Sequence, residues 1–183
     1  PSIGSSARKA SWDSEKRAIM KIVLISDTHG YCDGLADSIK QQQADYILHM
    51  GDGVTDAYRL KRETGLPVFV VSGNNDYGTQ EKEALFLILD HVPIFMTHGH
   101  RYGVHYGREQ LAETALQKEA KLALYGHTHI FRDEEIAGVR LINPGSPTLP
   151  RGGGSPSYAV LDLTDGKLQK ITVPAPKGLR WFF

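Results

Sequence analysis

The stretch KIVLISDTH, residues 21 to 29, decides how the rest of the chain is interpreted. Its apolar part, Lys21 to Ser26, is short and continuous, which is typical of a strand buried on both faces of a sheet. Asp27 and His29 follow at once, so side chains that can bind a metal ion stand where the strand ends. This order of a buried strand followed by a polar loop is repeated further along the chain.

Two further buried runs extend the pattern through the first half of the sequence. They are Tyr46 to Met50 and Pro67 to Val71. Helices are expected between the strands, from about Asp33 to Gln42 and from about Thr55 to Glu63. Right-handed crossovers would make the three strands parallel neighbours in one sheet.

The second half changes character, because short apolar runs now alternate with turn signals. One helix is expected over Gly107 to Lys121, with Leu111, Ala115 and Leu116 on one side. The remaining runs predict strands over Phe86 to Leu89, Val92 to Met96, Leu122 to Tyr125, Ile130 to Ile136, Val139 to Ile142, Tyr158 to Leu163 and Leu168 to Val173. We therefore expect an α/β protein in which two sheets pack face to face, with helices outside and mostly antiparallel strands in the second half.

Composition excludes several classes of protein. Lys+Arg and Asp+Glu number 21 each, so the chain lacks the broad positive field that draws a protein to nucleic acid or acidic membranes. Cys32 is the single cysteine, which excludes an intramolecular disulfide and a zinc site built on several thiolates. We expect no membrane segment, because no apolar run approaches the roughly 20 residues that a membrane helix needs. We also expect that the chain carries no secretory signal and that the protein is cytoplasmic.

The domain organisation is expected to be simple. Residues 1–19 are polar, rich in Ser, Ala and Lys, and without periodicity, so we interpret them as a leader from the expression vector or a disordered tail. Residues 20–183 are predicted to form a single domain, a length that can bury a two-layer core unaided.

Side chains that suit hard metal ions follow the predicted buried strands. They are Asp27, His29, Asp52, Asn74, Asp76, His98, His127 and His129. Because the carboxyl ends of the strands in open α/β sheets line one crevice, these side chains should meet at one edge of the domain. Alternation along an extended chain further suggests that Asp27 and His29 face one ion together, and that His127 and His129 do the same.

The donor set indicates two ions rather than one. Asp27, His29, Asp52, Asn74, His98, His127 and His129 supply carboxylate, amide and imidazole groups without a thiolate. Such ligands suit Mn²⁺ best, with Ni²⁺, Fe²⁺ and Zn²⁺ as alternatives. Each motif alone is weak, since Asp-x-His and Gly-Asn-Asn-Asp are also turn sequences. Their joint occurrence in this order favours a two-metal site, which can clamp a phosphate and activate a bridging water.

The chain resembles the calcineurin-like metallophosphoesterase superfamily. The motifs that carry the resemblance are Asp27-x-His29, Gly51-Asp52, Gly73-Asn74-Asn75-Asp76, Thr97-His98-Gly99-His100 and Gly126-His127-Thr128-His129. They resemble most the small bacterial and archaeal phosphodiesterase branch, to which the retromer subunit of the same fold is related. The resemblance implies a four-layer α-β-β-α sandwich of two mixed sheets flanked by helices.

The resemblance also implies roles for the ligands. One ion would be held by Asp27, His29, Asp52 and His129, and the second by Asp52, Asn74, His98 and His127, which makes Asp52 the bridge. A metal-bridging hydroxide would attack a phosphodiester whose oxygens contact both ions. The residues expected to act in catalysis are Asp52, Asn74, His98 and Asp76, with Asp76 orienting Asn74 or its loop rather than binding metal.

The sequence departs from the wider superfamily at Asn75, where many members carry a histidine that helps to protonate the leaving group. An amide cannot act as a general acid, a function that contributes about 10²–10⁴-fold. Esters with poor leaving groups should therefore turn over weakly. His100 is a candidate substitute donor, with a supporting or surface position as the alternative. His49 is expected to be a core histidine, and His91 and His105 are expected at the surface.

Several other features have two interpretations. Residues 143–146 are interpreted either as a turn or as a border of the site. A basic patch or a solvated helix face is formed by Arg59, Lys61 and Arg62. The apolar end of the chain either packs on the domain or forms a dimer contact, through Trp181, Phe182 and Phe183. The leading function is a phosphodiesterase acting on a small phosphodiester, without a membrane and with nucleic acid disfavoured. The alternatives are a non-catalytic metal-binding scaffold for a protein partner and a phosphomonoesterase, and a homo-oligomer is left open.

Overall fold

The computed structural model describes residues 18–174 and 176. The predicted leader, residues 1–19, lies almost entirely outside this range, as do Trp181, Phe182 and Phe183. Their assignments therefore stay predictions.

The first sheet is built around the three strands expected to be parallel. It contains β1 (Met20–Ile25), β2 (Tyr46–His49), β3 (Val68–Val70), β9 (Ala159–Thr164) and β10 (Lys167–Thr172), in the order β10-β9-β1-β2-β3. Strands β1, β2 and β3 are parallel, with Val23 opposite Ile47 and Ile47 opposite Val68. Strand β9 returns antiparallel to β1, and β10 pairs antiparallel with β9. The prediction of three parallel neighbours is confirmed.

The second sheet has the order β4-β5-β6-β8-β7. Its strands are β4 (Ala84–Leu89), β5 (Val92–Thr97), β6 (Leu122–Leu124), β7 (Phe131–Ile136) and β8 (Val139–Pro144). The predicted hairpin is present as β4 and β5. Strands β5, β6 and β8 run parallel, however, so the expectation of mostly antiparallel strands is wrong at the centre of this sheet. The reason is the helical connection between β5 and β6, because a crossover of that length allows a parallel return.

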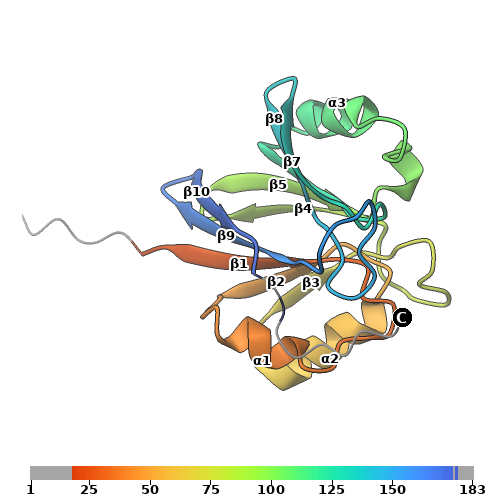
Figure 1. The fold of residues 1–183 in the computed structure, drawn as a ribbon. Helices are drawn as coiled ribbons and strands as arrows, with labels where there is room; N and C mark the ends of the chain where they lie inside the picture. The colour runs from red at the N-terminus through yellow and green to blue at the C-terminus, as the bar shows by residue number, and fades with distance from the viewer. Residues whose placement is uncertain (1–17, 175, 177–183) are drawn as a thin grey trace, which may run out of the picture.

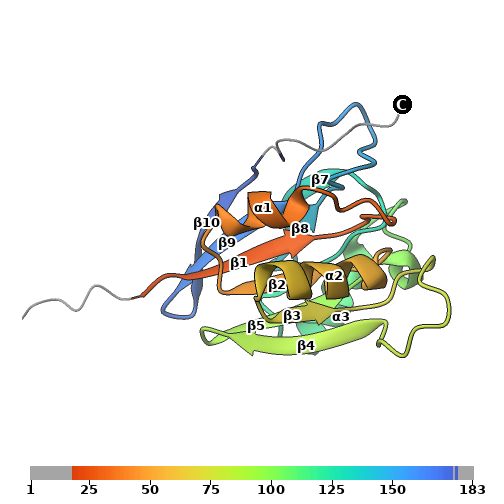
Figure 2. The same ribbon diagram turned by 90° about the horizontal axis from the view of Figure 1, so that it is seen from below.

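Helices cover the two outer faces, so that the layers read helix, sheet, sheet, helix (Figure 1). Helices α1 (Leu35–Lys40) and α2 (Val54–Thr64) lie on the first sheet, as the view from below shows (Figure 2). Helix α3 (Glu109–Gln117) and the short 3-10 helix η1 (His100–Tyr102) pack against the second sheet. The expected four-layer sandwich of two mixed sheets is confirmed.

Alternation along β1 explains its apolar run. Ile22 and Leu24 belong to the core between the two sheets, whereas Val23 and Ile25 pack with α1 and α2 on the other face. Burying each such side chain contributes about 1.5–3 kcal/mol. The strand therefore fixes both layers at once, and it ends beside the polar loops that follow.

One predicted face of α3 needs correction. Leu111, Ala112 and Ala115 are buried, but Leu116 is 51% exposed. Leu116 lies five residues after Leu111, which turns it roughly 140° away on a helix of 3.6 residues per turn.

No helix within residues 18–174 and 176 combines the length and apolar character needed to cross a bilayer.

Candidate metal centre

The loops that follow β1, β2 and β3 leave the sandwich at one edge (Figure 1). The backbone ties them together there. The N–H of Asp27 donates to the carbonyl oxygen of Gly51 at 2.9 Å, and the N–H of His29 donates to that of Asp52 at 2.9 Å. The N–H of Gly126, after β6, donates to the carbonyl oxygen of His98 at 3.0 Å. The predicted ligands are thus brought together from both sheets.

The backbone is left-handed rather than extended at five of the seven predicted metal ligands. The φ angles are 58° at Asp27, 50° at His29, 54° at Asp52, 69° at His127 and 59° at His129. Residues with a Cβ avoid this region, at a cost of about 1–2 kcal/mol each. Such strain persists only where the surrounding structure enforces it, and it collects at functional sites.

The expectation from chain alternation that His127 and His129 face one ion together is wrong, whereas their division between two ions, which the resemblance implied, agrees with the distances. His127 and His129 separate, because Nδ1 of His127 approaches Nε2 of His98 at 3.2 Å, whereas Nε2 of His129 lies 3.2 Å from Oδ1 of Asp27. Asp27 and His29 do stay together, with Nε2 of His29 3.7 Å from Oδ1 of Asp27.

The first cluster contains Asp27, His29 and His129. The two imidazole Nε2 atoms lie only 3.1 Å apart. The ring of His129 is oriented by its other nitrogen, because Nδ1 donates to the carbonyl oxygen of Leu149 at 2.7 Å. In the neutral ring Nε2 therefore carries the lone pair, and it points at the other members of the cluster.

The second cluster gathers around His98, which is fully buried. Its Nδ1 donates to the carbonyl oxygen of Met50 at 2.7 Å, which leaves the lone pair on Nε2. Nε2 lies 3.1 Å from Oδ1 of Asn74 and 3.4 Å from Oδ2 of Asp52. Together with Nδ1 of His127, these atoms form a set of imidazole, amide and carboxylate donors.

Asp52 lies between the two clusters. Its Oδ2 is 3.7 Å from Nε2 of His29 and 3.4 Å from Nε2 of His98. Asp27 Oδ1 is also within 3.9 Å of Nε2 of His98, and Asp27, Asp52 and His98 themselves form a group that could hold an ion. Both carboxylates therefore lie within reach of both clusters.

These residues fit divalent cations by their own chemistry. Oδ1 of Asp27 is buried and has no hydrogen-bond partner among the described residues, which is costly for a carboxylate oxygen. Lone pairs from two imidazole rings converge beside it. A cation bound among these atoms removes the mutual repulsion and the unmet hydrogen bond, and the mixture of oxygen and nitrogen donors suits Mn²⁺, Fe²⁺ or Zn²⁺.

The carboxylates are ionised in this environment. Burial alone would raise the pKa of Asp27, but the imidazoles of His129 and His29 hold that pKa below its ordinary value. Burial also opposes ionisation of Asp52, yet its contact with His98 and the bonds from Asn75 lower its pKa to about 2.

The pKa values of the histidines at the site are shifted in opposite directions. The pKa of His29 is raised by the neighbouring Asp27 carboxylate. Burial lowers the pKa of His98, but the nearby Asp52 and Asp27 outweigh it and raise the pKa above its ordinary value. Burial and the positive field of His98 lower the pKa of His127 to about 4, so this ring is neutral at pH 7.

Asp76 supports the site without facing the metal donors. Its Oδ2 accepts the backbone N–H groups of Asp52 (2.7 Å) and Gly73 (2.8 Å). Its Oδ1 accepts those of Gly53 and Val54, both at 2.9 Å, at the start of α2. These contacts hold the Asp52 loop and the Asn74 loop against each other, in line with the orienting role expected for Asp76.

Asn75 binds Asp52 directly. Its backbone N–H donates to Oδ1 of Asp52 at 2.8 Å, and its side-chain Nδ2 donates to Oδ2 at 2.7 Å. At the position where many members of the superfamily have a histidine, this chain therefore has a second fixed support for the Asp52 carboxylate.

Close backbone approach explains two of the glycines. A Cβ on Gly73 would lie 2.1 Å from Oδ1 of Asp52, and one on Gly126 would lie 1.9 Å from Oγ of Ser26. Ser26 in turn donates to Oδ2 of Asp27 at 2.6 Å. Larger residues at these two glycines would displace the supports of both carboxylates.

Residues 143–146 act as supports for the neighbouring loops. Nδ2 of Asn143 donates to the carbonyl oxygen of Gly126 at 2.9 Å, and Oγ of Ser146 donates to that of Asp27 at 2.8 Å. The segment thus borders the site, with Asn143 and Pro144 as the last residues of β8 and Gly145 and Ser146 directly after it, so it is a strand end and not a turn.

Four further histidines lie outside the predicted ligand set. His49 is fully buried, as predicted, and its Nδ1 accepts the N–H of Gly51 at 3.1 Å, while His91 is exposed. His105 is exposed but was missed as a neighbour of the site, because its ring centroid lies 4.6 Å from that of His127. His100 lies 5.4 Å from His98 by ring centroids, and its Nδ1 is buried without a partner among the described residues. No local signal in the sequence indicates that the ring of His105 lies beside the ligands.

Two cavities flank the clusters. One, of about 470 Å³, extends from His29, Asp52 and Asn75 to α2. The other, of about 450 Å³, begins at His129 and is lined mainly by small and apolar side chains of the loops around Ile130, Phe131 and Pro156. A phosphorus centre at the clusters would thus have space on both sides for its ester groups.

Comparison with known proteins agrees with this geometry. Residues 20–166 match the calcineurin-like phosphoesterase superfamily domain, and the chain belongs to that superfamily. It is 34% identical over 146 residues to the probable metallophosphoesterase YsnB of Bacillus subtilis, which covers 79% of this chain and 85% of that protein. It is 29% identical over 169 residues to the phosphodiesterase YfcE of Escherichia coli, covering 79% and 88% respectively.

Solved structures show the same fold. A predicted phosphoesterase from Streptococcus pneumoniae superposes with a TM-score of 0.73 at 28% identity, covering 85% of this chain and 89% of that one. Vps29 of Entamoeba histolytica, solved in complex with zinc, superposes with a TM-score of 0.71 at 22% identity, covering 85% and 97%. The chain is a metal-dependent phosphoesterase by family, and its fold is shared with Vps29.

Proposed function

We propose that the protein is a phosphodiesterase that holds two divalent metal ions, with Mn²⁺ the preferred metal, and hydrolyses small phosphate diesters. The observation that carries this proposal is the convergence of two donor clusters on Asp52, with the unpartnered Oδ1 of Asp27 between them. The similarity to YfcE, a phosphodiesterase by name, supports the choice of a diester.

Each cluster has a separate task in this proposal. Asp27, His29 and His129 hold the first ion, Asn74, His98 and His127 hold the second, and Asp52 is shared. When bound, two such ions polarise the phosphoryl oxygens and lower the pKa of a water between them. Asp76 and Asn75 keep the Asp52 carboxylate in place, so that both clusters stay aligned during turnover.

Residue 75 cannot protonate the leaving group, because the Asn75 amide is hydrogen-bonded to Asp52 and carries no ionisable proton. The enzyme should therefore prefer esters of acidic alcohols or phenols. We further propose that residues 20–183 form the single domain that acts in this way, in the cytoplasm.

The test is hydrolysis of bis(p-nitrophenyl) phosphate by metal-stripped protein to which Mn²⁺, Ni²⁺, Zn²⁺ or Mg²⁺ is restored separately. Turnover is expected with Mn²⁺ and is expected to be lost in Asp52→Ala. Asp37→Ala is the matched control, because Asp37 is an exposed carboxylate on α1 whose only described ion pair joins it to Lys40. p-Nitrophenyl phosphate in the same assay distinguishes a phosphomonoesterase.

The second candidate is a non-catalytic metal-binding scaffold for a protein partner. The specific observation in its favour is Asn75, which replaces a proton donor by a structural amide. Folded, metal-loaded protein that hydrolyses neither ester would favour the scaffold and contradict the phosphodiesterase.

A further inference from the structure

The cavity of about 470 Å³ connects the metal centre to the side of α2. At one end it is bordered by His29, Asp52 and Asn75, and at the other by Arg59 and Arg62. A group attached to a phosphorus atom at the clusters can therefore extend along this helix. The cavity belongs to the site by position, yet its far wall carries no metal ligand.

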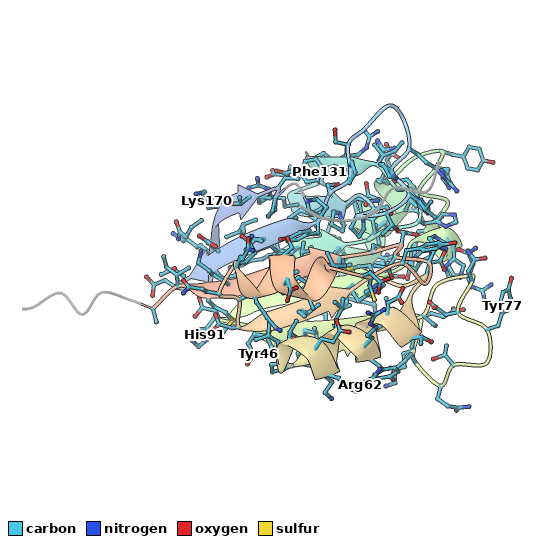
Figure 3. All side chains as sticks on the ribbon, turned by 60° about the horizontal axis from the view of Figure 1, so that its bottom comes forward. Tyr46, Arg62, Tyr77, His91, Phe131 and Lys170 are labelled. Carbon is cyan, nitrogen blue, oxygen red and sulfur yellow. The ribbon has the colours of Figure 1, made fainter. Side chains whose placement is uncertain are left out.

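Three lining residues of α2 lie on one stripe of the helix. Thr55, Arg59 and Arg62 are spaced by four and three positions, which places them one above the other on the same face. With a rise of about 1.5 Å per residue, Arg62 lies about 10 Å further along the axis than Thr55. Arg62 projects from α2 in the view with side chains (Figure 3).

The two arginines differ in their charge balance. The guanidinium of Arg59 is paired with Asp33 and Glu63, each at 2.7 Å. Within residues 18–174 and 176, the side chain of Arg62 has no ion pair or hydrogen bond. Arg62 therefore carries the uncompensated positive charge at the far end of the cavity.

The acidic residues of the same wall are already engaged. Oδ2 of Asp56 accepts the N–H of Gly30 at 2.8 Å, and Asp56 is 6% exposed. Both oxygens of Asp76 accept backbone N–H groups. These hydrogen bonds hold the two carboxylates against the backbone, whereas the exposed side chain of Arg62 lines the cavity.

We propose that this cavity is a subsite for an anionic ester arm, so that the preferred substrates are phosphodiesters in which one substituent ends in a further negative group. Arg62 is the residue that recognises this group. The inference rests on the proposed phosphodiesterase function and narrows its substrate class. Of the three basic residues Arg59, Lys61 and Arg62, it gives a role to Arg62 alone, because Arg59 is paired and Lys61 does not line the cavity.

The probe is a pair of dialkyl phosphates that differ only in charge: bis(3-carboxypropyl) phosphate and dibutyl phosphate. Both arms are identical in each compound, so the comparison is independent of which arm enters the cavity. Alkoxide leaving groups are poor, so both compounds act as ligands. Their affinities are measured by calorimetry and by competition with bis(p-nitrophenyl) phosphate, in metal-loaded protein.

In the unmodified protein the dicarboxylate should bind roughly fivefold more tightly than dibutyl phosphate, the size of one exposed charge-assisted contact. The ratio should fall to about one in Arg62→Gln and should weaken with salt. Lys61→Gln is the matched control, because Lys61 lies on the same helix with the same charge but does not line the cavity. It should keep the ratio.

An equal affinity for the two compounds in the unmodified protein, or a preference that survives in Arg62→Gln, would overturn the subsite. Melting temperatures establish that both variants fold. Failure of the proposed phosphodiesterase function would give a different result. Unmodified and Lys61→Gln protein would then not hydrolyse bis(p-nitrophenyl) phosphate with any metal, while calorimetry would still measure the affinities of the two ligands.

Discussion

Asp27 and Asp52 follow two adjacent parallel strands, β1 and β2, but the protein holds them in different ways. Oδ2 of Asp27 accepts hydrogen bonds from the hydroxyl of Ser26 and the N–H of His127, while its Oδ1 has no hydrogen bond from any described residue. Both oxygens of Asp52 accept bonds from Asn75. Both side chains are almost completely buried, so solvent does not compensate for this difference.

The contrast shows two ways to prepare a metal ligand. The Asp52 half is organised by protein contacts before an ion binds. The cluster around Asp27 keeps one buried carboxylate oxygen without a hydrogen bond from the described residues. This oxygen gains the most interaction energy when a cation binds. We therefore expect the Asp27 half to depend on its ion for stability, and the Asp52 half to govern whether both ions are held.

The largest effect is expected from neutralising either carboxylate. Asp27→Asn and Asp52→Asn should each lower kcat/KM by at least about 10²–10³-fold, because a charge that anchors the reacting groups is removed. Metal content should differ. Asp27→Asn should keep one ion per chain in the Asn74, His98 and His127 cluster, and Asp52→Asn should lose both. Elemental analysis after gel filtration measures this.

The opposite pattern, with both ions lost in Asp27→Asn and one retained in Asp52→Asn, would assign the bridge to Asp27, whose Oδ1 also lies 3.9 Å from His98.

The next largest effect concerns the support beneath Asp52. Asp76→Ala removes the acceptor of four backbone N–H groups, so kcat/KM should fall about 10–100-fold and stability should fall by about 2–3 kcal/mol. Asp45→Ala is a matched control, because Asp45 accepts a backbone N–H from Lys21 at 2.8 Å away from the site. Steady-state kinetics and urea unfolding compare the two. Unchanged kinetics in Asp76→Ala would show that Asp52 is positioned without it.

Proton competition should tie metal affinity to pH. The raised pKa values of His29 and His98 mean that each ring must lose a proton before it binds an ion, whereas His127 is already neutral at pH 7. Affinity for Mn²⁺ should therefore rise by up to about tenfold per pH unit at each cluster until the pH exceeds these pKa values. Titration calorimetry at pH 6, 7 and 8 measures the slope. A flat profile would mean that the rings are neutral throughout.

In the metal-free protein the sign of the stability effect is reversed. Raised pKa values stabilise the fold at pH values below the ordinary histidine pKa of 6.5, and this contribution is lost as the pH rises through the folded values.

The smallest effect is expected at Asn75. Asn75→Ala removes the bond to Oδ2 of Asp52 but keeps the backbone N–H that donates to Oδ1, so kcat/KM should fall only about fivefold. A series of diesters with leaving groups of different pKa measures a second quantity. The dependence on leaving group should be as steep as in the unmodified protein, and a steeper dependence would show that Asn75 assists departure.

Much of the fold was predictable because it follows from short-range patterns. The apolar runs at β1, β2 and β3 and the turn between β4 and β5 appear in the sequence as they do in the structure. The parallel centre of the second sheet was not predictable in this way. Its strand order joins β6 to β8 across the intervening β7, and such pairing depends on contacts between distant segments.

The candidate site shows the same division. Position after a strand was enough to indicate the ligand types at Asp27, Asp52 and His98. Position after a strand suggested that His127 and His129 face one ion, and only the resemblance divided them between two. In the structure Nδ1 of His127 lies by His98 and Nε2 of His129 lies by Asp27. Nor could position after a strand place the ring of His105 against His127, or show that Arg59 is paired while Arg62 has no ion pair in the part of the chain that the structure describes.

The sequence by itself determined the superfamily, the α/β layers and the chemical identity of the metal donors, because strand periodicity and the motifs at strand ends are local properties of the chain. Only the tertiary structure decided the distances at which the donors meet and, among the described residues, which carboxylate oxygen lacks a hydrogen bond and which arginine of α2 lacks an ion pair. Those properties arise from hydrogen bonds, ion pairs and burial between residues far apart in the chain, and their energies depend on distances that no linear pattern contains.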